Sequence, residues 1–307
     1  MKELKEELVS LLGFDAVRPE EPMKNHTTFR IGGPAQFFLT PKNTKELTGS
    51  IALCRSFHMP CTVIGNGSNL LVSDEGWRGA VISTENVRDF KISRTSIWAE
   101  AGMSLARLAL QARNASLSGL EFAAGIPGTL GGALVMNAGA YGSEMKDVLL
   151  WADVLAPDGT VHRKNAGELK LGYRTSIIPE ENYVVLAALL ELKKGDMEQI
   201  KARMDDLAAQ RKAKQPLEYP SAGSTFKRPP GCFAGKLIDE AGLRGFQTGG
   251  AAISEKHCGF VINKDHATAQ DVINLCRHVT CKVKQQTGVT LEPEVRFLTD
   301  NPDSVRI

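Results

Sequence analysis

Two separated glycine-rich segments carry the clearest chemical signal in this sequence. The first, Gly65-Asn66-Gly67-Ser68-Asn69, follows a strand-like run at Cys61–Ile64. A Gly-x-Gly-x-x-Gly dinucleotide motif is not complete, because Leu70 occupies the third glycine position and a strand-like run follows it. The loop could instead surround phosphate oxygens with backbone N–H groups and side-chain amides. An ordinary tight turn is the alternative that these residues leave open.

The second segment begins at Gly125 and is richer in small residues. Its candidate cofactor-binding residues are Gly125, Ile126, Pro127, Gly128, Gly131, Gly132, Asn137, Gly139 and Ala140. Glycine in a helix interior costs about 1 kcal/mol relative to alanine, so this density favours a ligand that approaches the backbone closely. Packing of a helix against a strand is the competing explanation. Two such segments together predict a large, phosphate-containing cofactor.

Composition excludes several classes of partner. The 307 residues include 37 Lys+Arg and 35 Asp+Glu, a net charge of +2, which argues against nucleic acid as a partner. The longest apolar run, Tyr183–Leu190, is too short to span a bilayer, and the N-terminus has no apolar signal core. None of the six cysteines forms a C-x-x-C pair, so neither a zinc site nor a redox dithiol is indicated. We expect a cytoplasmic protein with no metal and no membrane insertion.

Local patterns predict the elements that must position these segments. Asn43 and Glu46 form a capping-box pattern before a helix that runs to about Phe57, and Cys61–Ile64 forms the next strand. Ser104 and Thr268 are expected to cap two further helices, the second of which ends at Gly288. Helices and strands without regular βαβ alternation predict an α+β fold. Prolines and glycines after residue 213 indicate a domain boundary there.

Six short motifs follow one another in a fixed order along the chain. They are Asn25–Gly33, the loop at Gly65, Ile126–Gly142, Gly172–Ser176, Ala222–Lys227 and Leu291–Arg296. Together they resemble one enzyme family, the UDP-N-acetylenolpyruvoylglucosamine reductases, also called UDP-N-acetylmuramate dehydrogenases, which are flavoenzymes of bacterial peptidoglycan synthesis. The resemblance covers residues 24 to 298.

The resemblance implies an FAD-binding domain of the vanillyl-alcohol-oxidase (PCMH) type, followed by a smaller α+β substrate-binding domain. Its two subdomains would be residues 1–85, with the N-terminal helix, and 86–213; the substrate domain would be 214–307. FAD would lie between the subdomains, with its pyrophosphate at the two glycine-rich segments. Neither segment contains a histidine that could attach the flavin, so FAD is expected to be non-covalent, with His26 structural. The chain resembles the shorter subtype, which lacks an extra substrate-covering loop.

The resemblance also assigns a reaction. NADPH reduces the flavin, and hydride from flavin N5 then converts UDP-N-acetylglucosamine enolpyruvate to UDP-N-acetylmuramate. By motif, Arg174 holds the substrate carboxylate, Ser224 protonates the enolic carbon, and Glu294 assists in stabilising the intermediate. The choice of Glu294 over Glu292 depends on the motif alone.

Tyr173, Lys214 and Lys227 are the expected substrate-binding residues, and Tyr219 is a candidate contact for the uridine. Each candidate also has a purely structural explanation. Arg174 could form a surface ion pair, Ser224 could close an ST-turn, and the lysines could be solvated. We expect a monomer.

Two rival functions remain open from the sequence. A flavin oxidase of the same superfamily would use oxygen rapidly once reduced. A non-catalytic nucleotide-sugar-binding protein would be colourless when purified.

Overall fold

A computed structural model describes the backbone of residues 1–305 and the side chains of residues 1–303. The chain forms two compact units, each built from three stretches. Unit 1 comprises residues 1–18, 37–66 and 79–211, and unit 2 comprises residues 19–36, 67–78 and 212–307. The last crossing, after Arg211, lies near the boundary predicted after residue 213. The predicted boundaries at residues 85 and 213 both stay predictions.

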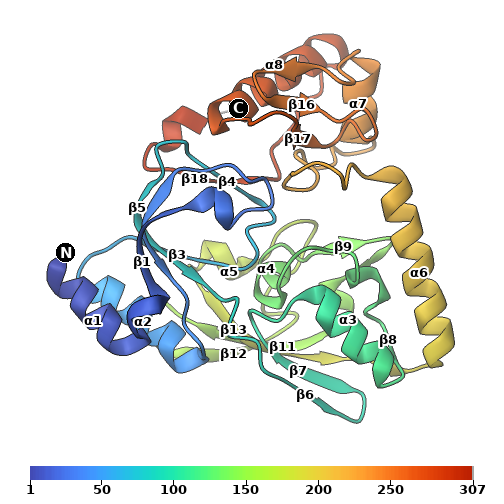
Figure 1. Cartoon of the computed structure of the whole chain (residues 1–307). Helices are drawn as coiled ribbons and strands as arrows, with labels where there is room; N and C mark the ends of the chain where they lie inside the picture. The colour runs from blue at the N-terminus through green and yellow to red at the C-terminus, as the bar shows by residue number, and fades with distance from the viewer. Residues whose placement is uncertain (306–307) are drawn as a thin grey trace. The chain divides into compact units, whose positions relative to one another are not determined.

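The framework of unit 1 is a five-stranded sheet of order β12-β11-β13-β7-β6 (Figure 1). Its strands are β6 (Phe90–Ser93), β7 (Ser96–Glu100), β11 (Leu149–Leu155), β12 (Val161–Asn165) and β13 (Val184–Glu191). All its neighbours pair antiparallel. The helices of unit 1 are α1 (Lys2–Leu12), α2 (Thr44–Ser56), α3 (Leu105–Asn114), α4 (Leu130–Val135), α5 (Ile177–Glu180) and most of α6 (Met197–Lys214).

Shorter strands complete this unit. They are β8 (Leu117–Ser118), paired with β14 (Lys193–Lys194), and β9 (Gly139–Ala140), paired with β10 (Ser143–Glu144). A further sheet has the order β1-β2-β5-β3, with β1 (Val17–Pro22), β2 (Pro34–Leu39), β5 (Trp77–Ser83) and β3 (Cys61–Ile64). The unit boundaries fall inside β1, β2 and β5. Strand β3 leads directly into the glycine-rich loop at Gly65.

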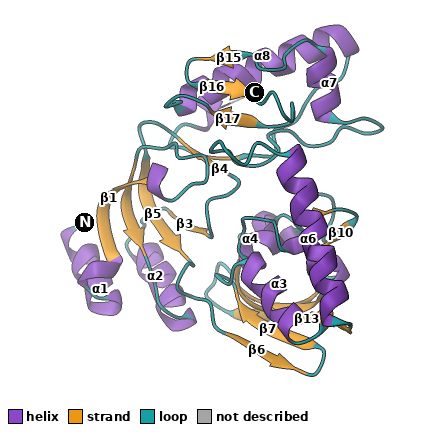
Figure 2. Ribbon diagram, turned by 45° about the vertical axis from the view of Figure 1, so that its right-hand side comes forward, coloured by secondary structure: helices purple, strands orange, loops and turns teal. Residues whose placement is uncertain are grey.

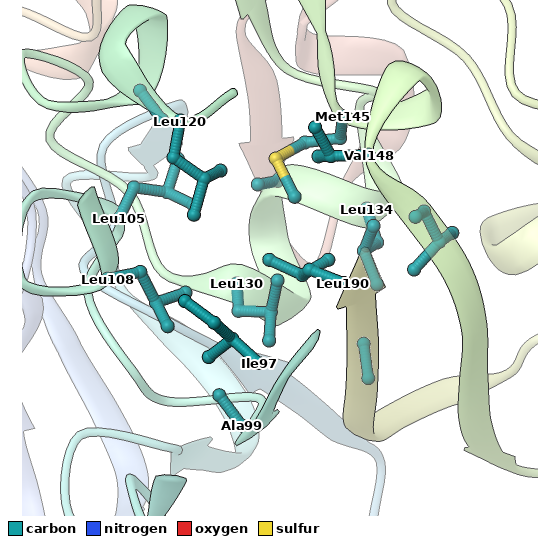
Figure 3. Close-up of a cluster of buried hydrophobic side chains, with 14 of the residues drawn as sticks. Ile97, Ala99, Leu105, Leu108, Leu120, Leu130, Leu134, Met145, Val148 and Leu190 are labelled. Atoms are coloured by element: carbon teal, nitrogen blue, oxygen red, sulfur yellow. The ribbon is translucent and has the colours of Figure 1, made fainter. Parts of the chain in front are cut away.

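Two hydrophobic cores surround the central strand β13. Helices α3 and α4 lie against one face of the five-stranded sheet (Figure 2). Figure 3 shows Leu108, Leu130 and Leu190 of this core converging from α3, α4 and β13. Leu186 of the same strand packs instead with Leu8 of α1, in the second core. Because helices cover both faces, β13 is nearly continuously apolar, which explains the eight-residue apolar run seen in the sequence.

Unit 2 places one long helix, α8 (Ala269–Thr287), against a small antiparallel sheet of order β15-β16-β17. The strands are β15 (Gln247–Thr248), β16 (Ala251–Ile253) and β17 (Val261–Asn263), and α7 (Ala234–Glu240) packs on α8. A parallel pair, β4 (Leu70–Val72) with β18 (Arg296–Leu298), completes the unit. Its core joins Phe29 and Leu71 to Val279 and Val295, so segments distant in sequence share one interior.

Most locally signalled elements are confirmed. Asn43 accepts a hydrogen bond from Glu46 N at the start of α2, and Thr268 forms a capping box with Asp271 on α8. Gly288 ends α8 with φ 73°, the left-handed conformation that glycine adopts at little cost. The sequence patterns did not predict β1, β2 and α7, and prolines in the first two obscured their strand character. None of the helices in residues 1–305 is long and apolar enough to cross a bilayer.

Candidate functional site

Within unit 1, the structure brings the start of the first glycine-rich segment against the second. Asn66 Nδ2 donates a hydrogen bond to the Pro127 carbonyl at 3.1 Å. Gly65 lies against Thr129: a Cβ at Gly65 would be 2.1 Å from Thr129 Oγ1. Thr129 is the N-cap of α4, with Oγ1 3.5 Å from Gly132 N. Two segments that are 61 residues apart in sequence are therefore in direct contact.

Helix α4 shows that some of these glycines serve packing. A Cβ at Gly131 would lie 2.9 Å from the Ala101 Cβ, and Gly131 N donates to Ala101 O at 2.8 Å. This contact supports the alternative of a helix packed closely on a strand for Gly131. At Gly132 the nearest atom to an added Cβ would be Thr129 Oγ1, at 3.5 Å, which is ordinary van der Waals contact. Gly131 and Gly132 are therefore not equivalent, although the sequence pattern treats them alike.

Asn137 holds the turn that carries Arg174. Its side chain is fully buried, its φ is 42°, and Nδ2 donates to the Gly172 carbonyl at 3.0 Å and to Glu144 Oε2 at 2.8 Å. Its Oδ1 accepts from Lys146 N at 3.0 Å. Both polar atoms of the Asn137 amide therefore have hydrogen-bond partners within the protein. A direct contact between Asn137 and a cofactor stays a prediction.

Arg174 lies beside the second glycine-rich segment. Gly172 and Thr175 close a tight turn around Tyr173 and Arg174, with Gly172 N donating to Thr175 O at 3.0 Å. Arg174 has φ 56°, and its Nη2 donates to the Gly139 carbonyl at 3.1 Å. A left-handed backbone at a non-glycine residue is uncommon and is often found at functional sites. The predicted carboxylate-binding cation and the predicted cofactor segment are thus in direct contact.

Arg211 is a further cation in this region, and it lies outside every motif of the sequence. The half-buried side chain at the end of α6 lies against Gly125, with Cδ 3.0 Å from where a Gly125 Cβ would be. Burial lowers the pKa of its guanidinium, and the nearby Tyr141 opposes that change. A half-buried guanidinium of this kind can balance a diphosphate charge. Arg211 lies within the long helix α6, where nothing in the local sequence distinguishes it from the other charged residues.

In unit 2 the second half of the first loop contacts the Asn25–Gly33 motif. Gly67 has φ 59°, and a Cβ there would be 2.2 Å from the His26 carbonyl. Thr28 N donates to Gly67 O at 3.3 Å, while Thr28 Oγ1 donates to Ser221 O at 2.7 Å. The His26 ring is hydrogen-bonded to Glu21 at 2.8 Å. Thr28 thereby links the loop to the segment that carries Ser224.

Ser224 and Glu294 lie on two segments that run side by side. Glu294 N donates to Thr225 O at 2.8 Å, and Phe226 forms an antiparallel bridge with Pro293. The buried Thr225 anchors its segment to β17, because its Oγ1 accepts a hydrogen bond from Val261 N at 2.9 Å. Ser224 is half-buried, and among the described residues its hydroxyl makes no hydrogen bond to the protein. The ST-turn alternative for Ser224 therefore lacks its defining contact.

The remaining candidates are more exposed. Lys227 pairs with Glu292 at 3.3 Å, and the Glu292 side chain is 71% exposed. Lys227 therefore forms a surface ion pair instead of being simply solvated, and its partner is Glu292, not the half-buried Glu294. Lys214 is exposed at the end of α6, and Tyr219 is exposed beyond it.

The first loop has features that suit a phosphate-containing cofactor. Within the described chain, the backbone N–H groups of Asn66, Gly67 and Ser68 have no protein acceptor. Consecutive free N–H groups are the arrangement that binds phosphate oxygens, so the loop fits the diphosphate of FAD. The Ser68 side chain makes no hydrogen bond to the protein within those residues either. Ile126, Gly128 and Ala140 supply backbone to the second segment; direct cofactor contacts at these positions stay predictions.

Comparison with known proteins gives consistent matches over nearly the whole chain. Residues 35–165 match the model of an FAD binding domain, and residues 215–298 match the C-terminal domain of UDP-N-acetylenolpyruvoylglucosamine reductase. The enzyme of that name from Agathobacter rectalis is 54% identical over 91% of this chain and 93% of its own. The one from Lachnoclostridium phytofermentans is 50% identical over 95% and 96%.

A solved structure extends this comparison to the fold. The crystal structure of UDP-N-acetylenolpyruvylglucosamine reductase from Thermus caldophilus has 38% sequence identity and a TM-score of 0.78. The match covers 92% of this chain and 100% of the Thermus chain. Together with the mixed helices and strands, these matches confirm the predicted α+β fold with an FAD-binding domain.

Proposed function

This chain belongs to the UDP-N-acetylenolpyruvoylglucosamine reductase family, and from that premise we propose that it reduces UDP-N-acetylglucosamine enolpyruvate to UDP-N-acetylmuramate with NADPH. It is an FAD-dependent oxidoreductase. The reaction supplies a precursor of peptidoglycan. The observation that best supports the proposal is the adjacency of the Ser224 and Glu294 segments, joined by the Glu294 N to Thr225 O bond, within the matched reductase domain.

The reaction sets three requirements for the protein. When bound at the glycine-rich segments, FAD would supply the hydride chemistry, taking hydride from NADPH and passing it to the terminal carbon of the enol ether. Negative charge then develops on the neighbouring carbon and on the substrate carboxylate. The protein must therefore provide a cation for the carboxylate, a group that stabilises the developing enolate, and a positioned proton source.

We assign the cation to Arg174. A guanidinium can hold a carboxylate through two parallel hydrogen bonds, which fixes the orientation of the substrate as well as its charge. The bond from Arg174 Nη2 to Gly139 O limits the rotation of the side chain and keeps it beside the cofactor segment. The strained turn around Arg174 is braced by Asn137 through the Gly172 carbonyl.

Ser224 is the proposed proton donor and Glu294 the proposed stabilising carboxyl group. A serine hydroxyl is a weak acid, so it can donate only to a strongly basic carbanion-like intermediate. The absence of a protein acceptor for the Ser224 hydroxyl among the described residues leaves its proton available for the substrate. Glu294 is preferred over Glu292 because Glu292 is exposed and paired with Lys227.

Other residues complete the proposed substrate site. Tyr173, Lys214 and Lys227 are proposed to contact the substrate, with the lysines suited to its diphosphate. The FAD is proposed to be non-covalent, and the protein to act as a monomer in the cytoplasm. Residues 214–307 are proposed as the substrate-binding domain.

An NADPH-oxidation assay tests the function directly. FAD-loaded protein is mixed with NADPH and UDP-N-acetylglucosamine enolpyruvate, and absorbance at the NADPH band is followed with and without the enolpyruvate. We expect oxidation that depends on the enolpyruvate and forms UDP-N-acetylmuramate. NADPH consumption that depends on oxygen alone would favour a flavin oxidase. A colourless protein that takes up no FAD would indicate a binding protein.

A further inference from the structure

We propose that Asn69 is a positioning residue for Glu294, rather than a ligand of the cofactor as its glycine-rich loop suggests. The inference rests on the proposed function, because it assumes the role assigned to Glu294. Asn69 Nδ2 donates to the Glu294 carbonyl at 3.0 Å, and the Asn69 carbonyl accepts from Arg296 N at 3.0 Å. One residue of the loop thus bonds the chain on both sides of Val295.

The backbone of Glu294 is fixed at both of its polar groups. Its N–H donates to Thr225 O at 2.8 Å, and its carbonyl accepts from Asn69. The residues that follow are held in register, since Arg296 pairs with Leu70 in the parallel β4–β18 pair and Val295 is buried. With the backbone fixed on both sides, the position of the Glu294 Cα and the direction of its Cα–Cβ bond are set, which is the first requirement for placing its carboxyl group.

Asn66, three residues earlier in the same loop, provides a natural comparison. It has the same side chain, yet its Nδ2 donates to the Pro127 carbonyl, in the second glycine-rich segment. The two amides therefore serve different partners: Asn66 joins the two proposed cofactor segments, and Asn69 joins the loop to a proposed catalytic residue. Asn137 acts like Asn69 in unit 1, because its amide bonds to Gly172 in the turn that carries Arg174.

The matched variants are Asn69→Asp and Asn66→Asp. Each replaces a donor amide by a carboxylate of nearly the same shape, which removes the hydrogen bond to a carbonyl oxygen. Three quantities are measured by flavin absorbance and fluorescence: the Kd for FAD, the rate of flavin reduction by NADPH, and the rate of flavin oxidation by UDP-N-acetylglucosamine enolpyruvate.

For Asn69→Asp we expect flavin oxidation by the enolpyruvate to slow by about fivefold, the typical effect of losing one hydrogen bond. The rate of flavin reduction by NADPH should stay within about twofold, since the lost bond concerns Glu294 alone. Both variants add one negative charge to the loop, so the FAD Kd should rise more in Asn66→Asp, which also loses the bond between the two cofactor segments. Glu294→Gln provides a double-mutant cycle: in that background Asn69→Asp should have little further effect, because Asn69 acts through Glu294.

Several results would overturn the proposal. One is a raised FAD Kd for Asn69→Asp with a normal rate of flavin oxidation by the enolpyruvate. Another is equal slowing of flavin reduction and flavin oxidation. The third is an effect of Asn69→Asp on flavin oxidation that is as large in the Glu294→Gln background as in the wild type. If Asn69→Asp does not fold, Asn69→Ser, whose side chain is too short to reach, takes its place with the same criteria. Failure of the proposed function is distinguishable, since the wild-type protein would then not be oxidised by the enolpyruvate at all.

Discussion

Replacing Gly65 by alanine tests how the first glycine-rich loop is built. An added Cβ would lie 2.1 Å from Thr129 Oγ1, 2.9 Å from its Cγ2 and 3.1 Å from its Cβ. Gly65 is not among the residues with positive φ, so alanine there meets no backbone penalty and the contact with Thr129 decides the outcome. The Thr129 side chain must move, and its Oγ1 then leaves Gly132 N at the start of α4.

Two costs follow from that displacement. Loss of a threonine N-cap costs about 1 kcal/mol, and overpacking of a close contact costs about 1–3 kcal/mol, so Gly65→Ala should destabilise by about 2–4 kcal/mol. Thr129→Ala alone removes only the cap and should cost about 1 kcal/mol. In the Thr129→Ala background the two nearest clashing atoms are gone. There Gly65→Ala should cost about 1 kcal/mol, at the low end of the overpacking range.

The assay is urea unfolding of the four proteins of this cycle, followed by tryptophan fluorescence, with the FAD Kd measured in parallel. We expect the double variant to be more stable than the sum of the single effects predicts, with a coupling of at least about 1 kcal/mol. FAD affinity should fall in Gly65→Ala and recover in part in the double variant. The reasoning would be refuted if the two substitutions changed the free energy of unfolding additively, or if the Gly65→Ala protein were as stable as wild type.

Three further predictions concern the reaction and one thiol. Ser224→Ala should leave flavin reduction by NADPH nearly intact and slow flavin oxidation by the enolpyruvate about 10²–10⁴-fold in stopped-flow measurements; equal losses would contradict the proton-donor role. Arg174→Lys should lower kcat/KM for the enolpyruvate about 10- to 150-fold by loss of a charge-assisted bidentate contact, and an unchanged value would remove Arg174 from the carboxylate site. A hydrogen bond from Cys54, helped by the charge of Arg55, lowers the pKa of the half-buried Cys61 thiol to about 7. Since the thiolate is the nucleophile, alkylation of Cys61 by iodoacetamide should rise with pH and reach half its maximum near pH 7. Cys54→Ala should move that midpoint upward, with the exposed Cys281 as internal control.

The local elements followed from the sequence because their signals are local. A cap such as Asn43 or Thr268 bonds to a backbone N–H three residues later, so residue type and spacing are enough to predict it. A helix at α4 was only the competing explanation for its segment, because glycines disfavour helices and only the contact of Gly131 with Ala101 shows why a glycine is needed there.

For the candidate site, too, the sequence predicts some features and only the tertiary structure shows others. The sequence alone indicated the family and its FAD cofactor. It also gave the glycine-rich segments, Arg174, Ser224 and Glu294 as candidates, because motif order and residue type carry that information. Asn66 and Asn69 look equivalent in sequence, and only the tertiary structure gave one to Pro127 and the other to Glu294.

Cys54 and Cys61 likewise have no motif spacing, yet the turn between α2 and β3 makes their thiols hydrogen-bonded neighbours. The physical reason is common to both cases. A side-chain hydrogen bond depends on which groups approach within about 3 Å, or slightly more for sulfur. For residues that are distant in sequence, that approach depends on how whole helices and strands pack. The types of the two residues do not indicate whether packing will bring them together.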